Sequence, residues 1–155
     1  MMERDYPYEG KKNNKCNYNP FLGVMKFSVD IRKLGGLEAR VTPILGELEA
    51  VKWLHKGPVI TSIHGEPLQH YVDGIMDPAS CTPSSPLNHA VVTVGYATGT
   101  DPKGNLQDIW VIRNSWGPQF GKHGHFAIVR GKGVCGMGKQ LLGVTATLND
   151  IKRRV

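Results

Sequence analysis

Residues 88–96, NHAVVTVGY, and residues 109–117, IWVIRNSWG, decide how this chain folds. Both stretches are rich in β-branched and aromatic residues, which favour strands, and each carries a polar side chain at one end of its strand. His89 begins the first predicted strand, and Asn114 follows the second. If the two strands pair antiparallel, these ends meet at one edge of the sheet, where the Asn114 amide oxygen can accept a hydrogen bond from the His89 imidazole. The second ring nitrogen would then be left to act as a general base.

On spacing alone, both motifs also have ordinary structural explanations. A histidine at a strand end is commonly a surface or core residue whose hydrogen bonds are satisfied, and Asn114-Ser115-Trp116-Gly117 is compatible with a simple turn. The two stretches therefore predict a sheet, whereas a catalytic role depends on further motifs.

Residues 46–56 predict the one amphipathic helix of the chain. Apolar residues recur at intervals of three, Glu47 and Glu49 lie in the first turn, and Gly57-Pro58 closes the helix. We expect the apolar stripe to pack against the sheet. Its members are Leu45, Leu48, Val51 and Leu54.

The remaining pattern is rich in short strands separated by turn formers. Residues 98–107 and 131–133 have the composition of hairpin-type connections, residues 68–72 predict a helical turn or loop, and residues 77–86 are rich in proline and serine. Together these features predict an α+β fold, in which a mainly antiparallel sheet curls into an open barrel with one amphipathic helix against it. The further predicted strands are residues 24–31, 59–63, 74–76, 125–130 and 144–148.

The composition is that of an ordinary globular chain. Its 155 residues are 40% hydrophobic and 21% charged, which excludes intrinsic disorder. No stretch approaches eighteen consecutive apolar residues, so no membrane span is predicted, and residues 1–5 lack the apolar core of a signal peptide. The formal net charge of +6 would suit an anionic partner, but the basic residues are scattered rather than arranged in a stripe with aromatics. We therefore expect no nucleic-acid and no membrane partner.

Cysteine usage leaves two possibilities open. Cys16, Cys81 and Cys135 form no C-x-x-C pair and stand at no zinc-ligand spacing with histidines, so no metal site is expected. An odd count permits at most one disulfide within the chain. Either the chain is cytosolic and its cysteines are reduced, or a partner cysteine lies on polypeptide absent here.

Six motifs in order along residues 5–148 give the chain a resemblance to the papain family of cysteine peptidases. The resemblance implies the right-hand, C-terminal domain of the papain-like fold. It also implies a thiol protease that hydrolyses peptide bonds through a Cys-His-Asn mechanism, with no metal and no organic cofactor. The motifs are Tyr6-Pro7-Tyr8-Glu9-Gly10, Gly57-Pro58-Val59, Asp73-Gly74-Ile75, Asn88-His89-Ala90-Val91, Asn114-Ser115-Trp116-Gly117 and Gly133-Val134-Cys135-Gly136.

The resemblance assigns chemical roles to residues of this chain. His89 is implied to be the catalytic histidine, Asn114 the residue that orients it, and Trp116 a cover that shields their hydrogen bond from water. In that family, a cysteine thiolate paired with the imidazolium attacks the peptide carbonyl and forms an acyl-enzyme. Residues around His89 are expected to shape the substrate groove, with Gln140 near the end of the pocket for the second substrate residue. The expected substrate-binding residues are Ser62, Leu87, Asn88, Ala90, Trp116 and Gln140.

None of the three cysteines stands in the sequence context of the family's nucleophile. That cysteine precedes the histidine by roughly 130–150 residues, so we expect it about 45–60 residues upstream of Met1. The resemblance instead pairs Cys81 with Cys135 in a disulfide and leaves Cys16 for a cysteine on the missing catalytic-cysteine half. Disulfides indicate an oxidising compartment, outside the cell or in the endolysosomal lumen, with any leader upstream of this chain.

The resemblance also implies a domain organisation. Residues 1–155 are expected to form a single domain, the C-terminal half of a papain-like peptidase. Within it, residues 1–20 are expected to be an inter-domain crossing segment, residues 21–148 the sheet-rich domain and residues 149–155 a basic tail. Met1 is expected to be an internal residue of a longer reading frame, which would make this a truncated chain.

Two functions follow from these expectations. The first is a cysteine peptidase acting on peptides or proteins, represented by its His/Asn half and inactive without the nucleophile and oxyanion donors on the missing part. The joint presence of His89, Asn114 and Trp116 favours this hypothesis. The alternative is a non-catalytic pseudo-peptidase whose groove wall binds propeptide-like segments or cystatin-type inhibitors. A monomer with a cooperative melt would favour the alternative, and insolubility without an upstream half would favour the peptidase.

Overall fold

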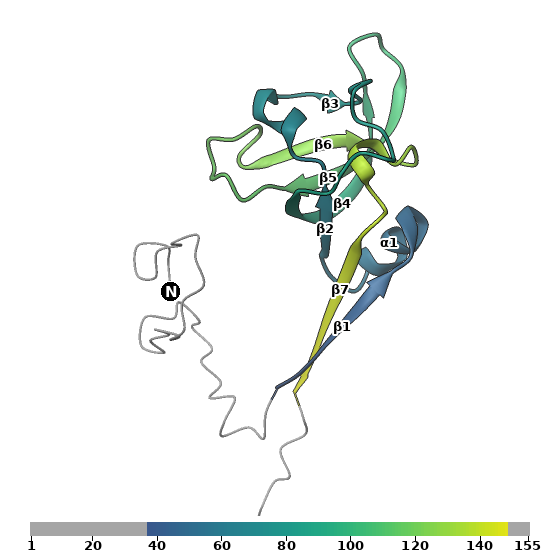
Figure 1. The fold of residues 1–155 in the computed structure, drawn as a ribbon, viewed down its shortest axis with the longest axis vertical. Coiled ribbons are helices and arrows are strands. Elements are labelled where there is room, and N and C mark those ends of the chain that lie inside the picture. Colours follow the sequence, from purple (N-terminus) through teal and green to yellow (C-terminus); the bar gives the residue numbers. More distant parts are fainter. Residues whose placement is uncertain (1–36, 149–155) are drawn as a thin grey trace, which may run out of the picture. The chain divides into compact units, whose positions relative to one another are not determined.

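The computed structural model describes residues 37–148, which form seven strands, one α-helix and two short 3₁₀ helices (Figure 1). The predicted crossing segment at residues 1–20, the predicted strand at residues 24–31 and the basic tail at residues 149–155 lie outside the described residues, as does Cys16. The described elements are β1 (Leu37–Ile44), α1 (Gly46–Leu54), β2 (Val59–Ile63), η2 (Glu66–His70), β3 (Ile75–Met76), β4 (His89–Thr100), β5 (Leu106–Arg113), β6 (His125–Val129), η3 (Val134–Gly136) and β7 (Leu141–Leu148).

The seven strands form one sheet in the order β1-β7-β2-β4-β5-β6-β3. Strand β2 pairs antiparallel with β7 and β4, and β5 pairs antiparallel with β4 and β6, whereas the two-residue strand β3 pairs parallel with β6. The edge strands β1 and β3 do not pair with each other, so the barrel stays open within the described residues. The predicted α+β class, with a mainly antiparallel open sheet and one helix, is confirmed.

The core lies on one face of the central strands, because successive side chains of a strand point to opposite faces. Along β2, Val59, Thr61 and Ile63 are buried while Ile60 is exposed, and β4, β5 and β6 repeat this alternation. The hydroxyls of Thr61 and Thr93 lie 2.7 Å apart and satisfy each other inside the core. A packed core therefore supports the strand ends that carry the predicted site. The other buried residues of β4 to β6 are Val91, Trp110, Ile112, Phe126, Ile128 and Val129.

Helix α1 packs on the sheet with a different face from the one its leucines predict. Leu45 and Leu48 are 85% and 72% exposed, whereas Ala50 is fully buried and Leu54 packs against the core. Glu47 turns inward instead, because its carboxylate accepts hydrogen bonds from β5 and from the loop after β6. Residues 47, 50 and 54 share one face of a helix with 3.6 residues per turn, which leaves Leu48 outside. The predicted stripe is therefore wrong at Leu45 and Leu48.

Three connections also differ from the sequence prediction. Strand β1 (Leu37–Ile44) was missed because it contains Pro43, which lacks a donor for the ladder and is tolerated here at the edge of the sheet. Strands β4 and β5 extend into the connection predicted at residues 98–107, so the turn is limited to residues 101–105. The hairpin predicted at residues 131–133 is wrong, because β6 and β7 are not neighbours and the chain passes through η3 between them.

The disulfide between Cys81 and Cys135 is present, as the resemblance implied, and both cysteines are buried. It joins the proline- and serine-rich loop to η3. Two backbone hydrogen bonds accompany it: the N–H of Cys135 donates to the carbonyl of Cys81 at 3.3 Å, and the N–H of Gly136 donates to the carbonyl of Thr82 at 3.1 Å. The loop that leads to β4 is therefore tied to the segment that leads to β7.

The tip of the β4–β5 hairpin is expected to open in acid. The Asp101 carboxylate accepts hydrogen bonds from the backbone N–H groups of Lys103 and Asn105, both at 2.9 Å, and from the Asn105 side chain at 3.1 Å. The Asn105 side chain is the main cause that lowers the pKa of Asp101 in the folded chain. Because the folded pKa is depressed, this contribution is present above the unfolded pKa of about 4 and is lost as pH falls through the folded value. Amide exchange at Lys103 and Asn105, followed by NMR, should therefore accelerate below about pH 4. An Asp101→Asn tip with the same acid response would contradict this account.

Candidate active site

The antiparallel pairing of β4 with β5 brings His89, the first residue of β4, beside Asn114, the residue after β5. The Nε2 atom of His89 lies 2.8 Å from the Oδ1 atom of Asn114, so the predicted hydrogen bond is present. Asn114 is only 6% exposed, and a hydrogen bond shielded from water in this way is stronger than an exposed one.

The hydrogen bonds around Asn114 fix which ring nitrogen of His89 carries the proton. The backbone N–H of Ser115 donates to Oδ1 of Asn114 at 2.8 Å, and this identifies the atom that faces His89 as the amide oxygen. An oxygen can only accept, so Nε2 of His89 must donate. In the neutral ring, Nδ1 then holds the lone pair, and no hydrogen bond reaches it from the described residues. The geometry presents Nδ1 as a base.

Trp116 lies on one face of the His89 ring. The two ring centroids are 5.0 Å apart with an interplanar angle of 35°. Phe120 supports the indole edge-on at 5.1 Å, and Phe126 in turn contacts Phe120 at 6.1 Å. Trp116 remains 43% exposed, so it shields the imidazole on one side and presents its outer face to solvent.

A second set of contacts holds His89 from the side of β2. Ile63 is the register partner of His89, and the backbone N–H of Asn88 donates to the carbonyl of Ile63 at 3.1 Å. The Asn88 side chain accepts a hydrogen bond from the N–H of Gly65 at 2.8 Å. A Cβ on Gly65 would lie 2.6 Å from Cβ of His89, so the backbone there approaches the histidine as closely as a glycine allows. Sequence reasoning missed Gly65, whose only signal was a glycine just after a predicted strand.

The predicted groove residues lie at several places in the fold. Ser62 of β2 pairs with Ala90 of β4, and the N–H of Ser62 donates to the carbonyl of Gln140 at 3.0 Å, so these three residues are neighbours. Leu87 lies against Gly136, where a Cβ would come within 2.7 Å of its side chain. The Asn88 side chain is engaged with the backbone as described above, and Trp116 stands over His89 on the side of the β5–β6 connection. Their roles in substrate binding stay predictions.

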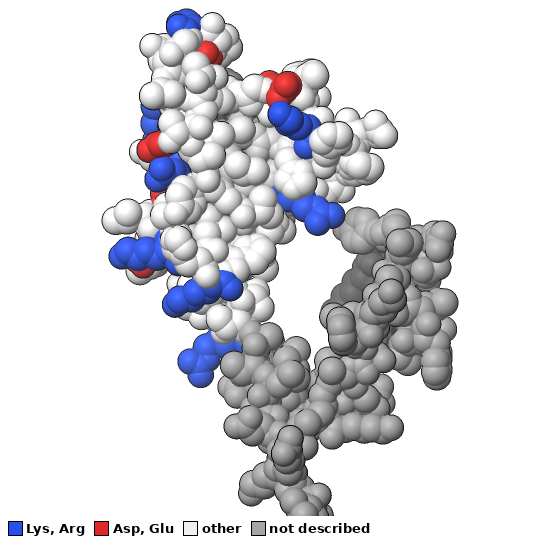
Figure 2. Space-filling view, turned by 180° about the vertical axis from the view of Figure 1, so that it is seen from behind, with Lys and Arg blue, Asp and Glu red and all other residues white. Residues whose placement is uncertain are grey.

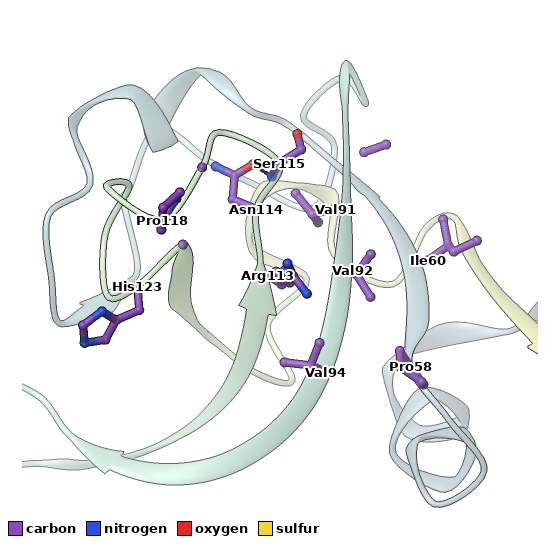
Figure 3. A pocket seen from close by; sticks show the side chains of 13 residues that line it. Pro58, Ile60, Val91, Val92, Val94, Arg113, Asn114, Ser115, Pro118 and His123 are labelled. Atoms are coloured by element: carbon purple, nitrogen blue, oxygen red, sulfur yellow. Dashed lines mark hydrogen bonds between the residues drawn. The ribbon is translucent and has the colours of Figure 1, made fainter. Parts of the chain in front are cut away.

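An open groove of about 780 Å³ follows the outer face of the sheet (Figure 3). Figure 3 shows Asn114 and Ser115 at one end of this outer groove, with Val94 and Pro58 toward the other. Ile60 and Val94 are each 40% exposed, and the one charged side chain among the lining residues is the cation of Arg113. The lining residues are Pro58, Ile60, Ala90, Val91, Val92, Val94, Arg113, Asn114, Ser115, Gly117, Pro118, His123 and Gly124.

The described residues offer no metal site, and one face of the molecule is largely uncharged. Across residues 37–148, no group of three or more histidine, cysteine, aspartate or glutamate side chains is arranged to hold a metal ion. Lysines and arginines are spread along the edges of the face in Figure 2, with a broad uncharged surface between them. No helix among the described elements has the length and apolar content needed to cross a membrane.

Comparison with known proteins identifies relatives over nearly the whole chain. A family model described as "Papain family cysteine protease" matches residues 1–145. The chain is 30% identical over 149 residues to "Probable cysteine protease RD19B" of Arabidopsis thaliana, a match that covers 95% of this chain and 38% of that relative. It is 31% identical over 141 residues to Cathepsin F of Drosophila melanogaster, covering 87% of this chain and 21% of that relative. The chain thus spans well under half the length of these relatives.

Solved structures share the fold. The structure of digestive procathepsin L 3 from Tenebrio molitor larval midgut matches with a TM-score of 0.63 and 30% identity, over 94% of this chain and 43% of that chain. The bromelain protease from Ananas comosus, solved in complex with the E64 inhibitor, matches with a TM-score of 0.57 and 28% identity, over 70% of this chain and 50% of that chain. The likeness therefore extends from sequence to three-dimensional structure.

Proposed function

Because this chain belongs to the papain family of cysteine proteases, we propose that it supplies the histidine and asparagine of a Cys-His-Asn peptidase. The observation that carries the proposal is the 2.8 Å hydrogen bond from Nε2 of His89 to Oδ1 of Asn114. That bond leaves Nδ1 with the lone pair that a thiol needs as its proton acceptor. We place the nucleophile, a cysteine, on the part of the longer relatives that these 155 residues do not span.

In the assembled enzyme, the cysteine thiol would give its proton to Nδ1 of His89 and form a thiolate–imidazolium pair. The thiolate sulfur attacks the carbonyl carbon of the scissile bond, and the imidazolium returns its proton to the leaving amine as the C–N bond breaks. Water then attacks the thioester while His89 takes its proton, which releases the acid and restores the thiol. Asn114 acts throughout by holding the ring in the tautomer that keeps Nδ1 available.

None of the three cysteines stands in the sequence context of the nucleophile. Without the catalytic-cysteine half, we therefore expect no peptidase activity from these 155 residues. The mechanism also needs donors for the oxyanion of the tetrahedral intermediate, and in this family those lie with the cysteine. The substrate groove would be shared, with Ser62, Ala90 and Gln140 on one side of His89 and Trp116 on the other.

We assign the outer groove to the catalytic-cysteine half. Its lining is mainly apolar, and Ile60 and Val94 remain 40% exposed. A contiguous exposed apolar surface commonly marks a protein–protein interaction site. The groove reaches Asn114 and Ser115, next to the site that the thiol must approach. Arg113 would pair with a carboxylate of the covering half, because an isolated cation in an apolar contact is costly.

The buried disulfide suits an oxidising compartment, and we propose that the protein works outside the cell or in the endolysosomal lumen. The substrates are peptides or proteins that bind in extended conformation in the substrate groove around His89. Cystatin-type inhibitors are candidate partners of that substrate groove. The proposal includes no metal and no organic cofactor.

Labelling the native protein with a peptidyl epoxide or diazomethyl ketone tests this function. We expect intact mass to show a labelled species heavier than the 17.1 kDa of this chain, or this chain disulfide-linked through Cys16 to a labelled partner. An unlabelled native species at 17.1 kDa would overturn the peptidase proposal. If that species were also a monomer with a cooperative melt, a pseudo-peptidase that binds propeptide-like or cystatin-like partners would replace it.

A further inference from the structure

The Glu47 carboxylate is a polar group that the proposed mechanism does not use. Its Oε2 atom accepts hydrogen bonds from the indole N–H of Trp110 at 2.6 Å and from the backbone N–H of Gly131 at 2.7 Å. Its Oε1 atom accepts one from the backbone N–H of Gly133 at 2.8 Å. These donors lie 63, 84 and 86 positions away in the sequence, so one side chain connects α1, the core of β5 and the loop after β6.

The loop after β6, residues 131–138, is shaped around this carboxylate. Gly131 and Gly133 adopt positive φ angles of 88° and 63°, which turn their N–H groups toward Glu47. A Cβ on Gly138 would lie 3.0 Å from Cγ of Glu47. Because all three partners are N–H donors, the group at position 47 must accept through both of its oxygens, and only a carboxylate does so.

The same loop continues into residues that lie beside His89. The carbonyl of Cys135 accepts a hydrogen bond from the N–H of His64 at 2.9 Å, and the carbonyl of Gln140 accepts one from the N–H of Ser62 at 3.0 Å. His64 directly precedes Gly65, whose backbone lies against Cβ of His89. Residues 131–140 thus lead without interruption from Glu47 to the end of β2 that supports His89.

We propose that Glu47 is a positioning residue, which sets residues 131–140 and through them the groove wall at Ser62 and Gln140 and the backbone support of His89. The inference rests on the proposed function for its consequence in catalysis, but the coupling from Glu47 to His89 stands on contacts within the described residues. The neighbouring Glu49 provides a matched control, because its carboxylate is exposed and, among residues 37–148, pairs only with Lys52 on the same helix.

Glu47→Gln tests the proposal in the native protein by hydrogen exchange and NMR. The amide of Gln replaces one acceptor with a donor, so we expect exchange at the amides of Gly131 and Gly133 to accelerate about tenfold relative to the core amide of Ile112. The amides of Ser62 and His64 should follow by at least a few-fold, and the imidazole signals of His89 should shift. Glu49→Gln should leave all of these unchanged.

Two outcomes would overturn the inference. In the first, Gly131 and Gly133 exchange faster while Ser62, His64 and His89 keep their wild-type behaviour, which would make the effect of Glu47 local. In the second, every amide including Ile112 accelerates equally, which would make Glu47 a residue of global stability only. In the chain joined to its catalytic-cysteine half, we also expect Glu47→Gln to lower kcat/KM about tenfold. Absence of any peptidase activity would count against the proposed function, while the exchange data would still decide the coupling.

Discussion

Replacing His89 by alanine is expected to lower kcat/KM of the assembled peptidase by about five to six orders of magnitude, the loss seen when a member of such a catalytic set is removed. Among the described residues, only His89 combines a ring nitrogen fixed by a buried amide with a second nitrogen that accepts no hydrogen bond. Without that base the thiol keeps its proton at neutral pH, because an unassisted cysteine has a pKa of about 8.5. The measurement is hydrolysis of a fluorogenic peptide, together with the rate of alkylation of the thiol at pH 6.

His70→Ala is the matched control for this experiment. His70 is an exposed histidine at the end of η2, and its replacement should change kcat/KM by less than about threefold, as expected of a surface residue outside the site. Both variants should melt within a few degrees of the parent, since His89 lies at the start of β4 rather than in its core. A His89→Ala enzyme that retains more than about one thousandth of the activity would show that another group acts as the base.

The meeting of His89 and Asn114 could be predicted from the sequence because it depends on local features alone. Each residue lies at the end of a run of β-branched residues, and antiparallel pairing brings such ends together. The strand Val59–Ile63 was predicted with its observed bounds for the same reason, since its β-branched residues and its Gly57-Pro58 entry are both local signals.

Three of the features that could not be predicted depend on contacts between distant segments. The buried face of α1 is set by the hydrogen bonds of Glu47 to Trp110, Gly131 and Gly133. These partners are distant in the sequence, so the periodicity of the helix does not reveal them. The path from β6 through η3 to β7 follows from sheet order, which short loops with glycines do not encode. The close approach of Gly65 to His89 likewise arises from packing between β2 and β4. The local pattern thus predicted that His89 and Asn114 meet, and the family resemblance implied their catalytic role. The residues that support the pair could be identified only from the tertiary structure.

Replacing both Cys81 and Cys135 by alanine is expected to cost about 4 kcal/mol of the free energy of unfolding, from the loop-closure entropy of cysteines 54 positions apart. That is a large part of the 5–15 kcal/mol typical of a domain, so the variant should unfold at a much lower urea concentration. Both sulfurs are buried, and alanine also removes their packing against the core. Urea unfolding followed by tryptophan fluorescence measures the difference, with Cys16→Ala as the control that retains this disulfide.

Removing the disulfide should also change the structure around His89. This outcome distinguishes a disulfide that holds the native site in place from one that only restricts the unfolded chain. Cys135 accepts the hydrogen bond of the His64 N–H, and His64 adjoins the glycine that lies against His89. In the folded double variant at low temperature, amide exchange at His64 should therefore be faster than in the Cys16→Ala control, and the His89 imidazole signals should shift. If the variant is less stable but His64 and His89 behave as in the control, the disulfide stabilises the protein only by restricting its unfolded state. A variant as stable as the parent would mean that the hydrogen bonds from Cys135 and Gly136 to the loop at Cys81 and Thr82 hold these segments without it.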